Sequence, residues 1–121
     1  MAATRSYDAG DDVLRDFALR LKRSIRGIDL ACRYGGEEFV IVMPETDMTV
    51  AAMVAERLRR RIAAEPFAIA QGSRHIPVTI SIGIAALHGK EDTAAALLKR
   101  ADQALYRAKR DGRNRVVPDA A

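Results

Sequence analysis

The fold is decided by the stretch at residues 33–44, which reads RYGGEEFVIVMP. Its apolar run, residues 39–43, stops at a proline and is typical of a strand that is covered on both faces. The dipeptide Gly35-Gly36 precedes this run, and two glycines allow the positive φ angles of a hairpin turn. We therefore predict that residues 29–34 pair with residues 37–43 as an antiparallel hairpin.

Three amphipathic helices accompany this hairpin. Residues 14–25, 51–62 and 97–108 each repeat apolar side chains at the i, i+3, i+4 and i+7 spacing that places them on one helical face. Each helix is therefore expected to bury one stripe on a common core. The second and third helices have candidate N-terminal caps, which are Thr46 or Asp47, and Asp92 or Thr93.

Further strands complete the predicted sheet. Residues 78–85 alternate apolar side chains with small or polar ones, which gives the strand one fully apolar face. Residues 67–70 are predicted to pair with this strand across a turn, and residues 115–117 are predicted to add a short last strand. The predicted architecture is α/β or α+β, with helices on a mostly antiparallel sheet. It forms a single domain over residues 1–121, in which residues 1–9 are loose.

The composition limits the class of protein. The 121 residues, 49% hydrophobic and 30% charged, are ordinary for a soluble globular domain and argue against a disordered or fibrous chain. No apolar run is long enough to cross a bilayer, and the start lacks the pattern of a signal peptide. The single Cys32 excludes an intrachain disulfide and a cysteine metal cluster, and two histidines make a histidine-rich metal site unexpected. These features predict a reducing, cytoplasmic setting.

The net charge of +4 is unevenly distributed, because basic residues gather at 57–61 and again at 107–115. Such clusters attract the phosphates of nucleotides, nucleic acids or lipid headgroups, although solvated helix faces explain them equally well. Aromatic residues make up only 5% and there is no tryptophan, which argues against a platform for single-stranded nucleic acid and against a membrane-surface helix. We therefore expect neither a nucleic acid polymer nor a membrane as a partner of this chain.

Two carboxylates, Glu37 and Glu38, directly follow the turn glycines. Neighbouring residues of a strand face opposite sides, so these two acids are expected to do different jobs. The bare glycine backbone leaves room for a flat or polyanionic ligand, and a carboxylate beside a phosphate site usually holds Mg²⁺. An ordinary hairpin with exposed acids is the alternative.

Residues 35–39, which read GGEEF, resemble the GGDEF signature of diguanylate cyclases in its GGEEF form. Residues 26–29 (RGID) resemble the RxxD motif that stands five residues before the signature. Residues 79–85 (TISIGIA) resemble a later strand of the family, and residues 102–114 (DQALYRAKRDGRN) resemble its DxALYxAKxxGRN element. Because these matches agree in order and spacing over residues 10–117, the resemblance is specific.

The resemblance implies a nucleotidyl-cyclase-like fold with a ferredoxin-like palm. It implies an enzyme that condenses two GTP molecules into cyclic di-GMP and two pyrophosphates, with Mg²⁺ or Mn²⁺ as cofactor and two domains facing each other in a homodimer. Glu37 is then a metal ligand that also helps to deprotonate the attacking 3′-hydroxyl, and Glu38 is a second catalytic acid near the metal. The residues that resemble the family's nucleotide contacts are Asp11 for the guanine, Gly35 and Gly36 for close approach, and Lys109 and Arg113 for the phosphates.

Arg26 and Asp29 resemble the family's product-binding inhibitory site, and Arg57 resembles the arginine that completes it. An arginine offers a planar fork to the phosphates and guanine of cyclic di-GMP, and an aspartate accepts hydrogen bonds from guanine donors. The alternative for Arg26 and Asp29 is a local ion pair at a helix end. The alternative for Lys109 and Arg113, four residues apart, is a solvated basic helix terminus.

The sequence departs from the family at its start. A complete domain opens with a strand that carries an aspartate metal ligand and with a helix that contributes two nucleotide contacts, whereas residues 1–7 lack apolar alternation and are not expected to supply that strand. We therefore expect a truncated N-terminus and an exposed apolar strand edge, through which chains would associate. An active catalytic domain is one hypothesis, and a catalytically inactive module that binds cyclic di-GMP and dimerises is the other. A GTP-sensing domain is a weaker third.

Overall fold

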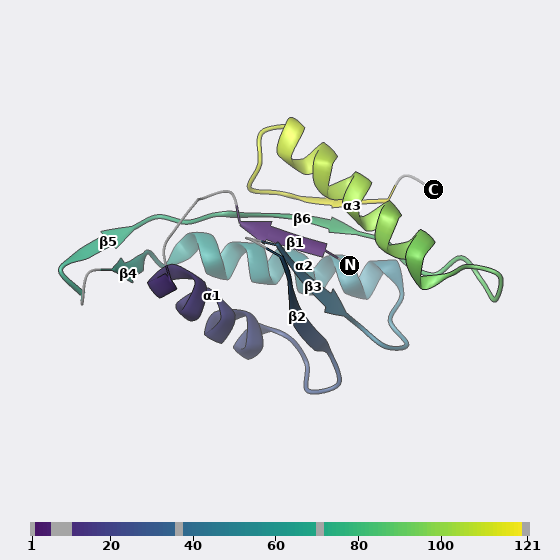
Figure 1. Ribbon diagram of the computed structural model, residues 1–121, viewed down its shortest axis with the longest axis horizontal. Coiled ribbons are helices and arrows are strands. Elements are labelled where there is room, and N and C mark those ends of the chain that lie inside the picture. The colour runs from purple at the N-terminus through teal and green to yellow at the C-terminus, as the bar shows by residue number, and fades with distance from the viewer. Residues whose placement is uncertain (1, 6–10, 36–37, 70–71, 120–121) are drawn as a thin grey trace.

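The computed structural model describes residues 2–5, 11–35, 38–69 and 72–119 of the chain. Three helices and seven strands occur in these ranges (Figure 1). In chain order they are β1 (Ala2–Arg5), α1 (Asp11–Ser24), β2 (Leu30–Gly35), β3 (Glu38–Val42), α2 (Met48–Ala64), β4 (Phe67–Ile69), β5 (Arg74–Ile76), β6 (Ile80–Ile84), α3 (Ala94–Arg110) and β7 (Val116–Pro118).

A five-stranded sheet in the order β2-β3-β1-β6-β7 forms the centre of the molecule. Its neighbouring strands are antiparallel except β6 and β7, which run parallel. The helices α1 and α2 pack on one face, where Phe17 and Leu58 share a core with Phe39 and Ile82. The helix α3 packs on the opposite face, against β6 (Figure 1). This arrangement confirms the predicted mixed architecture and the predicted hairpin of β2 and β3.

The strand β1 corrects the expectation that the first strand is missing and that residues 1–9 are loose. Ala3 pairs with Phe39 of β3 on one side and with Ile82 of β6 on the other, so β1 lies inside the sheet. The expected exposed edge on β3 is therefore wrong as well. A backbone flanked by two unpaired strands finds hydrogen-bond partners on both sides whatever its side chains are, which is why four residues without apolar alternation become a strand. Residues 1 and 6–9 of the range expected to be loose lie outside the described residues.

The strand β4 does not join the main sheet, contrary to the prediction that it pairs with residues 78–85. It pairs instead with β5 in a separate two-stranded sheet, in which Phe67 lies opposite Ile76 and Ile69 lies opposite Arg74. Because β5 follows β4 more closely in the chain than β6 does, pairing with β5 closes a shorter loop and costs less chain entropy. The hairpin is tied to α1, because the Arg20 guanidinium lies 3.7 Å over the Phe67 ring and donates to the carbonyl oxygen of Glu65.

The predicted helix caps are present. The Asp47 carboxylate accepts a hydrogen bond of 2.9 Å from the Val50 backbone N–H at the start of α2. The Thr93 hydroxyl accepts one of 3.1 Å from the Ala96 backbone N–H at the start of α3. Each cap satisfies one of the backbone donors that the first turn of a helix leaves without a partner.

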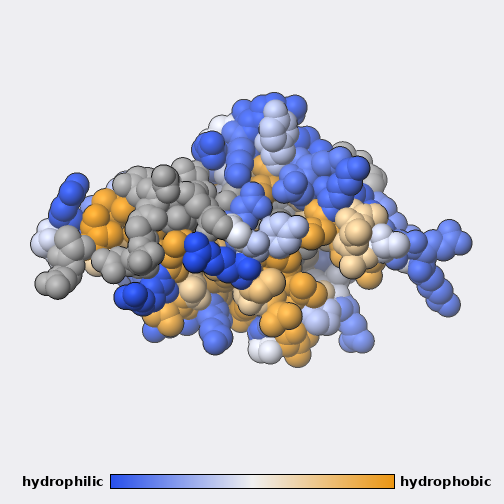
Figure 2. All heavy atoms as spheres, viewed as in Figure 1, coloured by the Kyte–Doolittle hydropathy of each residue, from blue (hydrophilic) through white to orange (hydrophobic). Residues whose placement is uncertain are grey.

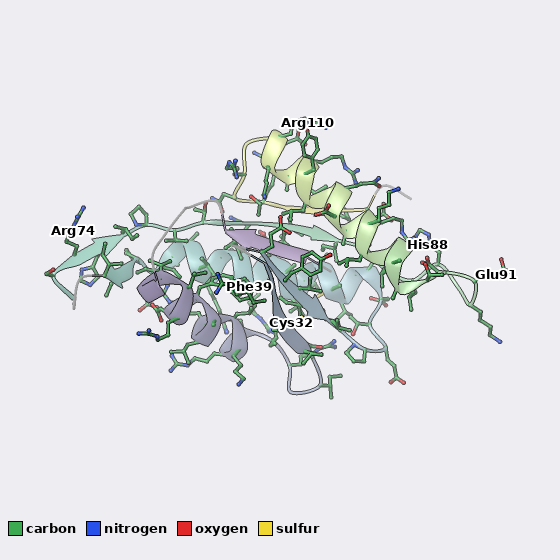
Figure 3. All side chains as sticks on the ribbon, viewed as in Figure 1. Cys32, Phe39, Arg74, His88, Glu91 and Arg110 are labelled. Carbon is green, nitrogen blue, oxygen red and sulfur yellow. The ribbon has the colours of Figure 1, made fainter. Side chains whose placement is uncertain are left out.

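The loop before α3 carries His88 and Glu91 (Figure 3), and a charged cluster fixes this loop. The Arg100 guanidinium donates to both carboxylate oxygens of Asp92, and its Nε lies 3.0 Å from the Asp119 carboxylate. The hydrogen bonds from Arg100 and from the backbone N–H of His88 hold the pKa of the Asp92 carboxyl well below its ordinary value. This cluster ties the loop before α3 to the end of the described chain.

The surface divides by polarity. Hydrophilic side chains gather over α3, whereas apolar side chains are exposed around β2 (Figure 2). Leu30 and Tyr34 of β2 are each more than half exposed. None of the helices within the described ranges is long and apolar enough to cross a bilayer.

Candidate functional site

The described residues of the signature next to its turn are Gly35, where β2 ends, and Glu38, where β3 begins. Leu30 lies opposite Val42 and Gly35 lies opposite Glu38, with a shift of register between Arg33 and Gly35. Gly36 and Glu37 lie outside the described residues. Glu38 is therefore the described acid of the signature, and it stands at the first position of β3.

The Glu38 side chain lies on the face of the sheet that α3 covers. Its Oε1 lies 4.0 Å from Lys109 Nζ, and both side chains are about one-third exposed. Because the charges meet at a partly solvated position, the pair itself contributes little stability and both groups are accessible to a ligand. A pocket beside this pair is lined by Tyr34, Glu38, Val40, Ala95, Leu98, Lys99 and Asp102.

The end of α3 presents the candidate phosphate-binding cations. The helix stops in a Schellman motif, in which the Arg113 N–H donates to the Ala108 carbonyl at 2.9 Å and the Gly112 N–H donates to the Lys109 carbonyl at 3.4 Å. Gly112 takes the positive φ of 120° that this motif requires. Arg113 and Asn114 follow with φ of 63° and 47°. Lys109 thus lies in the last turn of the helix and Arg113 in the turn that follows it.

Arg26 and Asp29 form a tight local pair between α1 and β2. The Asp29 carboxylate accepts from the Arg26 backbone N–H at 2.9 Å and from its Nη2 at 2.9 Å, and Arg26 Nη2 also donates to the Thr46 hydroxyl. The Asp29 side chain is fully buried while that of Arg26 is one-third exposed. Burial works toward a higher pKa of Asp29, but the hydrogen bonds from Arg26 outweigh it and hold this pKa below its ordinary value.

Asp11 begins α1, whereas Arg57 of α2 contacts the other end of α1. Arg57 Nη2 donates to the carbonyl oxygen of Ser24 at 3.1 Å, which brings α2 to the last residue of α1, two positions before Arg26. Asp11 is the first residue of α1, and its side chain lies outside the described part of the structure. The helix spans about 20 Å, so the predicted guanine contact and the predicted inhibitory site are well separated.

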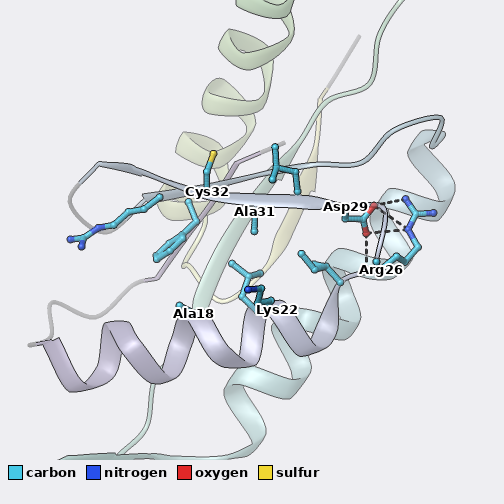
Figure 4. A pocket seen from close by; sticks show the side chains of 12 residues that line it. Ala18, Lys22, Arg26, Asp29, Ala31 and Cys32 are labelled. Atoms are coloured by element: carbon cyan, nitrogen blue, oxygen red, sulfur yellow. Dashed lines mark hydrogen bonds and ion pairs between the residues drawn. The ribbon is translucent and has the colours of Figure 1, made fainter.

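The pair Arg26–Asp29 lies at one end of a pocket of about 540 Å³ between α1 and β2 (Figure 4). Ala18 and Lys22 line it from α1, and Ala31 and Cys32 line it from β2. Cys32 is a free, exposed thiol. The pocket brings apolar walls and basic side chains together, which suits a ligand with both flat apolar and anionic parts.

A metal site is not assembled by the described residues alone. Within the described ranges, no group of three or more histidine, cysteine, aspartate or glutamate side chains is placed to hold a metal ion. Glu38 offers a carboxylate oxygen, which is the hard donor that Mg²⁺ prefers, next to the position of Glu37 in the sequence.

One contact near the site was missed by sequence reasoning. Arg59 of α2 donates to the side-chain oxygen of Asn114, in the turn that carries Arg113. The GRN tripeptide at residues 112–114 was a signal that this turn matters, but nothing in the local sequence identifies its partner on α2.

The chain matches the family described as "Diguanylate cyclase, GGDEF domain" over residues 4–115. It is 54% identical over 118 residues to the response regulator PleD of Caulobacter vibrioides, which covers 98% of this chain and 26% of that protein. It is 42% identical over 114 residues to diguanylate cyclase A of Treponema denticola, which covers 94% of this chain and 30% of that protein. The chain therefore spans less than a third of the length of these two curated relatives.

Solved structures share the fold. The GGDEF domain of DgcB from Caulobacter crescentus, in complex with c-di-GMP, superposes with a TM-score of 0.86 at 26% identity, over 99% of this chain and 76% of that chain. The active GGEEF domain of a diguanylate cyclase from Vibrio cholerae superposes with a TM-score of 0.85 at 32% identity, over 99% of this chain and 81% of that chain.

Proposed function

Because this chain belongs to the GGDEF diguanylate cyclase family, we propose that it is a catalytic domain that condenses two GTP molecules into cyclic di-GMP and two pyrophosphates. The observation that carries the proposal is the meeting of Glu38 with Lys109, an acid of the GGEEF signature beside a cation of the GRN element. Nucleotidyl transfer needs a carboxylate base at the attacking hydroxyl and cations near the leaving phosphates, and the contact of Glu38 with Lys109 supports a site in which the signature carboxylates lie beside such a cation. Since GTP is an intracellular nucleotide, we assign the activity to the cytoplasm.

The proposed reaction consists of two nucleophilic substitutions, one at the α-phosphorus of each GTP. The 3′-hydroxyl oxygen of each GTP forms a bond to the α-phosphorus of the other, the bond from that phosphorus to the β-phosphate oxygen breaks, and pyrophosphate leaves. Glu37 takes the proton of the hydroxyl, while Lys109 and Arg113 hold the phosphates whose negative charge grows as pyrophosphate departs. Asp11 accepts the N1–H and N2–H donors of guanine, and Gly35 and Gly36 let the nucleotide lie against the backbone.

The reaction needs two GTP molecules to face each other, so we propose a homodimer of this domain as the active species. The expected exposed strand edge no longer supports this, because β1 fills that position. The support is chemical: each chain brings one GTP, and the product is symmetric.

We propose Mg²⁺, or Mn²⁺ in its place, as the cofactor that neutralises phosphate charge. Glu38 provides carboxylate oxygens of the kind that Mg²⁺ prefers, and Glu37 is the adjacent carboxylate in the sequence. The described residues alone assemble no group of three metal-ligating side chains. Glu37 is therefore the proposed ligand, and Glu38 is the neighbouring acid that faces Lys109.

The role of Lys109 is tested by replacing it with methionine, which has a side chain of similar length but no charge. Lys109→Met should lower kcat/KM for GTP by about 100-fold, because one preorganised charge on the developing anion is lost. Lys90→Met is the matched control, since Lys90 is an exposed lysine in the loop before α3. Product formation is measured by chromatography, and thermal melts verify that both variants fold. Equal turnover by the two variants would remove Lys109 from the site.

A second candidate function is the binding of cyclic di-GMP at Arg26 and Asp29, completed by Arg57. The support is geometric: Asp29 holds the Arg26 guanidinium in place and Arg57 reaches the end of α1 beside it, so cations gather before any ligand arrives. In an active enzyme, binding of cyclic di-GMP at this site would inhibit the reaction by its product. In an inactive domain, binding of cyclic di-GMP would itself be the function.

Calorimetry with cyclic di-GMP tests this second function. Arg26→Met should abolish binding, whereas Arg23→Met, which removes an exposed arginine from the last turn of α1, should leave it intact. Binding that survives Arg26→Met would place the dinucleotide elsewhere.

A further inference from the structure

Arg59 of α2 turns its side chain toward the protein rather than toward solvent. It belongs to a run in which residues 57, 59, 60 and 61 are all arginine, yet its side chain is only 19% exposed. Its Nη1 donates to Asn114 Oδ1 at 2.8 Å, in the turn between α3 and β7. Its Nε and Nη2 donate to the two carboxylate oxygens of Glu56, at 2.5 and 2.9 Å. Glu56 therefore holds the guanidinium in the orientation that reaches Asn114.

The turn that Arg59 contacts has an unfavourable backbone. Arg113 and Asn114 are consecutive residues with left-handed φ angles of 63° and 47°, although neither is glycine. Such residues cost of order 1 kcal/mol each and persist only when surrounding contacts hold them. Asparagine tolerates this region better than arginine does, so the strain falls mainly on Arg113.

Several hydrogen bonds hold this turn, and they come from different directions. The Arg113 N–H is tied to α3, and Arg115 Nε donates to the Arg113 carbonyl at 3.0 Å within the turn itself. The Arg115 carbonyl accepts from the Ile82 N–H of β6 at 2.9 Å. The bond from Arg59 ties the turn laterally to α2, whose residues also line a pocket with the start of β7.

We propose that Arg59 is a positioning residue that orients Arg113 toward the GTP phosphates by holding Asn114. This inference rests on the proposed function, because it takes Arg113 as a phosphate-binding cation. In this role Arg59 acts through Asn114 and does not itself bind the nucleotide. Its guanidinium is bound by Glu56 on α2 and by Asn114 in the turn before β7.

Arg60 is the matched control for Arg59. It is the next residue on the same helix and pairs with the same carboxylate, at 3.1 Å from Glu56, but its side chain is 74% exposed. Arg60→Met thus removes the same charge from the same partner without removing the bond to Asn114. Asn114→Leu removes that bond from the other side.

Two ligands measured on the same variants separate positioning from general damage. Calorimetry of the 121-residue chain with Mg²⁺ and a non-hydrolysable GTP analogue should show about tenfold weaker binding in Arg59→Met and in Asn114→Leu. The double variant should be no weaker than either single one, since both remove one interaction. Binding of cyclic di-GMP should change less than twofold in all of them. Arg60→Met should match the unsubstituted chain with both ligands.

Amide hydrogen exchange gives a readout that does not need GTP. Arg59→Met should speed exchange of the Arg113 N–H at least tenfold relative to Arg60→Met, because the turn loses its lateral restraint. If the unsubstituted chain failed to bind the GTP analogue, the proposed function would fail while exchange still decided whether Arg59 holds the turn. The inference is overturned by equal exchange in the two variants, or by a loss of GTP and cyclic di-GMP binding in equal measure.

Discussion

Replacing Gly83 with alanine should unfold or displace α3, although it adds a single methyl group. Gly83 is the residue before the last in β6, and its Cα faces α3. A Cβ atom at this position would lie 2.2 Å from the Leu105 nitrogen, 2.3 Å from the Ala101 carbonyl oxygen and 2.8 Å from the Leu105 Cα. All three are backbone atoms, so no side-chain rotation relieves the clash.

The size of the effect follows from these distances. Ordinary van der Waals contact begins at 3.4 Å, so the backbone of α3 must move away from β6 by about 1 Å. That shift opens space beside Ala101, Ala104 and Ala108, which are fully buried and small enough to permit the present close approach. Overpacking usually costs about 1–3 kcal/mol, and the rigidity of both partners puts Gly83→Ala at the upper end, about 3 kcal/mol or more.

Urea denaturation followed by circular dichroism measures this free energy of unfolding. Gly27→Ala is the control, because a Cβ there meets nothing within 4 Å and its φ is not left-handed. The control should stay within about 0.5 kcal/mol of the unsubstituted chain. If Gly83→Ala were as stable as Gly27→Ala, the close packing of α3 on β6 would be wrong, and with it the placement of Lys109.

Two further changes test the loop before α3 and the start of α2. Because the folded-state pKa of Asp92 is depressed, its stabilising effect is complete above its ordinary pKa of 3.8 and is lost as the pH falls further. Thermal melts from neutral pH downward should therefore lose less stability on acidification in Asp92→Asn than in the parent, and parallel pH curves would contradict the pairing with Arg100. Asp47→Ala should lower the free energy of unfolding by about 1 kcal/mol in urea, because the Val50 N–H loses its cap. An unchanged midpoint would show that this cap carries no stability.

The local patterns in the sequence predicted most of the fold. Apolar periodicity located the three helices, and the Gly-Gly dipeptide located the hairpin of β2 and β3. The strand β1 could not be predicted in this way, because Ala2–Arg5 has no pattern of its own and its pairing depends on β3 and β6. The partner of β4 was wrong for a related reason, since apolar pattern identifies a strand but does not say which neighbour it pairs with.

The candidate site divides along the same line. Arg26 and Asp29 are three positions apart, so their spacing in the sequence already suggested contact. Glu38 and Lys109 were each singled out by resemblance, and their distance of 4.0 Å required the fold. The bond from Arg59 to Asn114 joins residues 55 positions apart, and a run of arginines gives no sign of which one turns inward.

We propose that this chain makes cyclic di-GMP with the acids of its GGEEF hairpin. The most direct measurement is chromatography of the chain incubated with GTP and Mg²⁺, beside Glu37→Gln, which keeps the size of the side chain and removes its charge. We expect cyclic di-GMP and pyrophosphate from the unsubstituted chain and a loss of at least 100-fold in Glu37→Gln. Equal product from both would contradict the role of Glu37, and no product from a chain that still binds cyclic di-GMP would contradict the enzyme and favour the binding module.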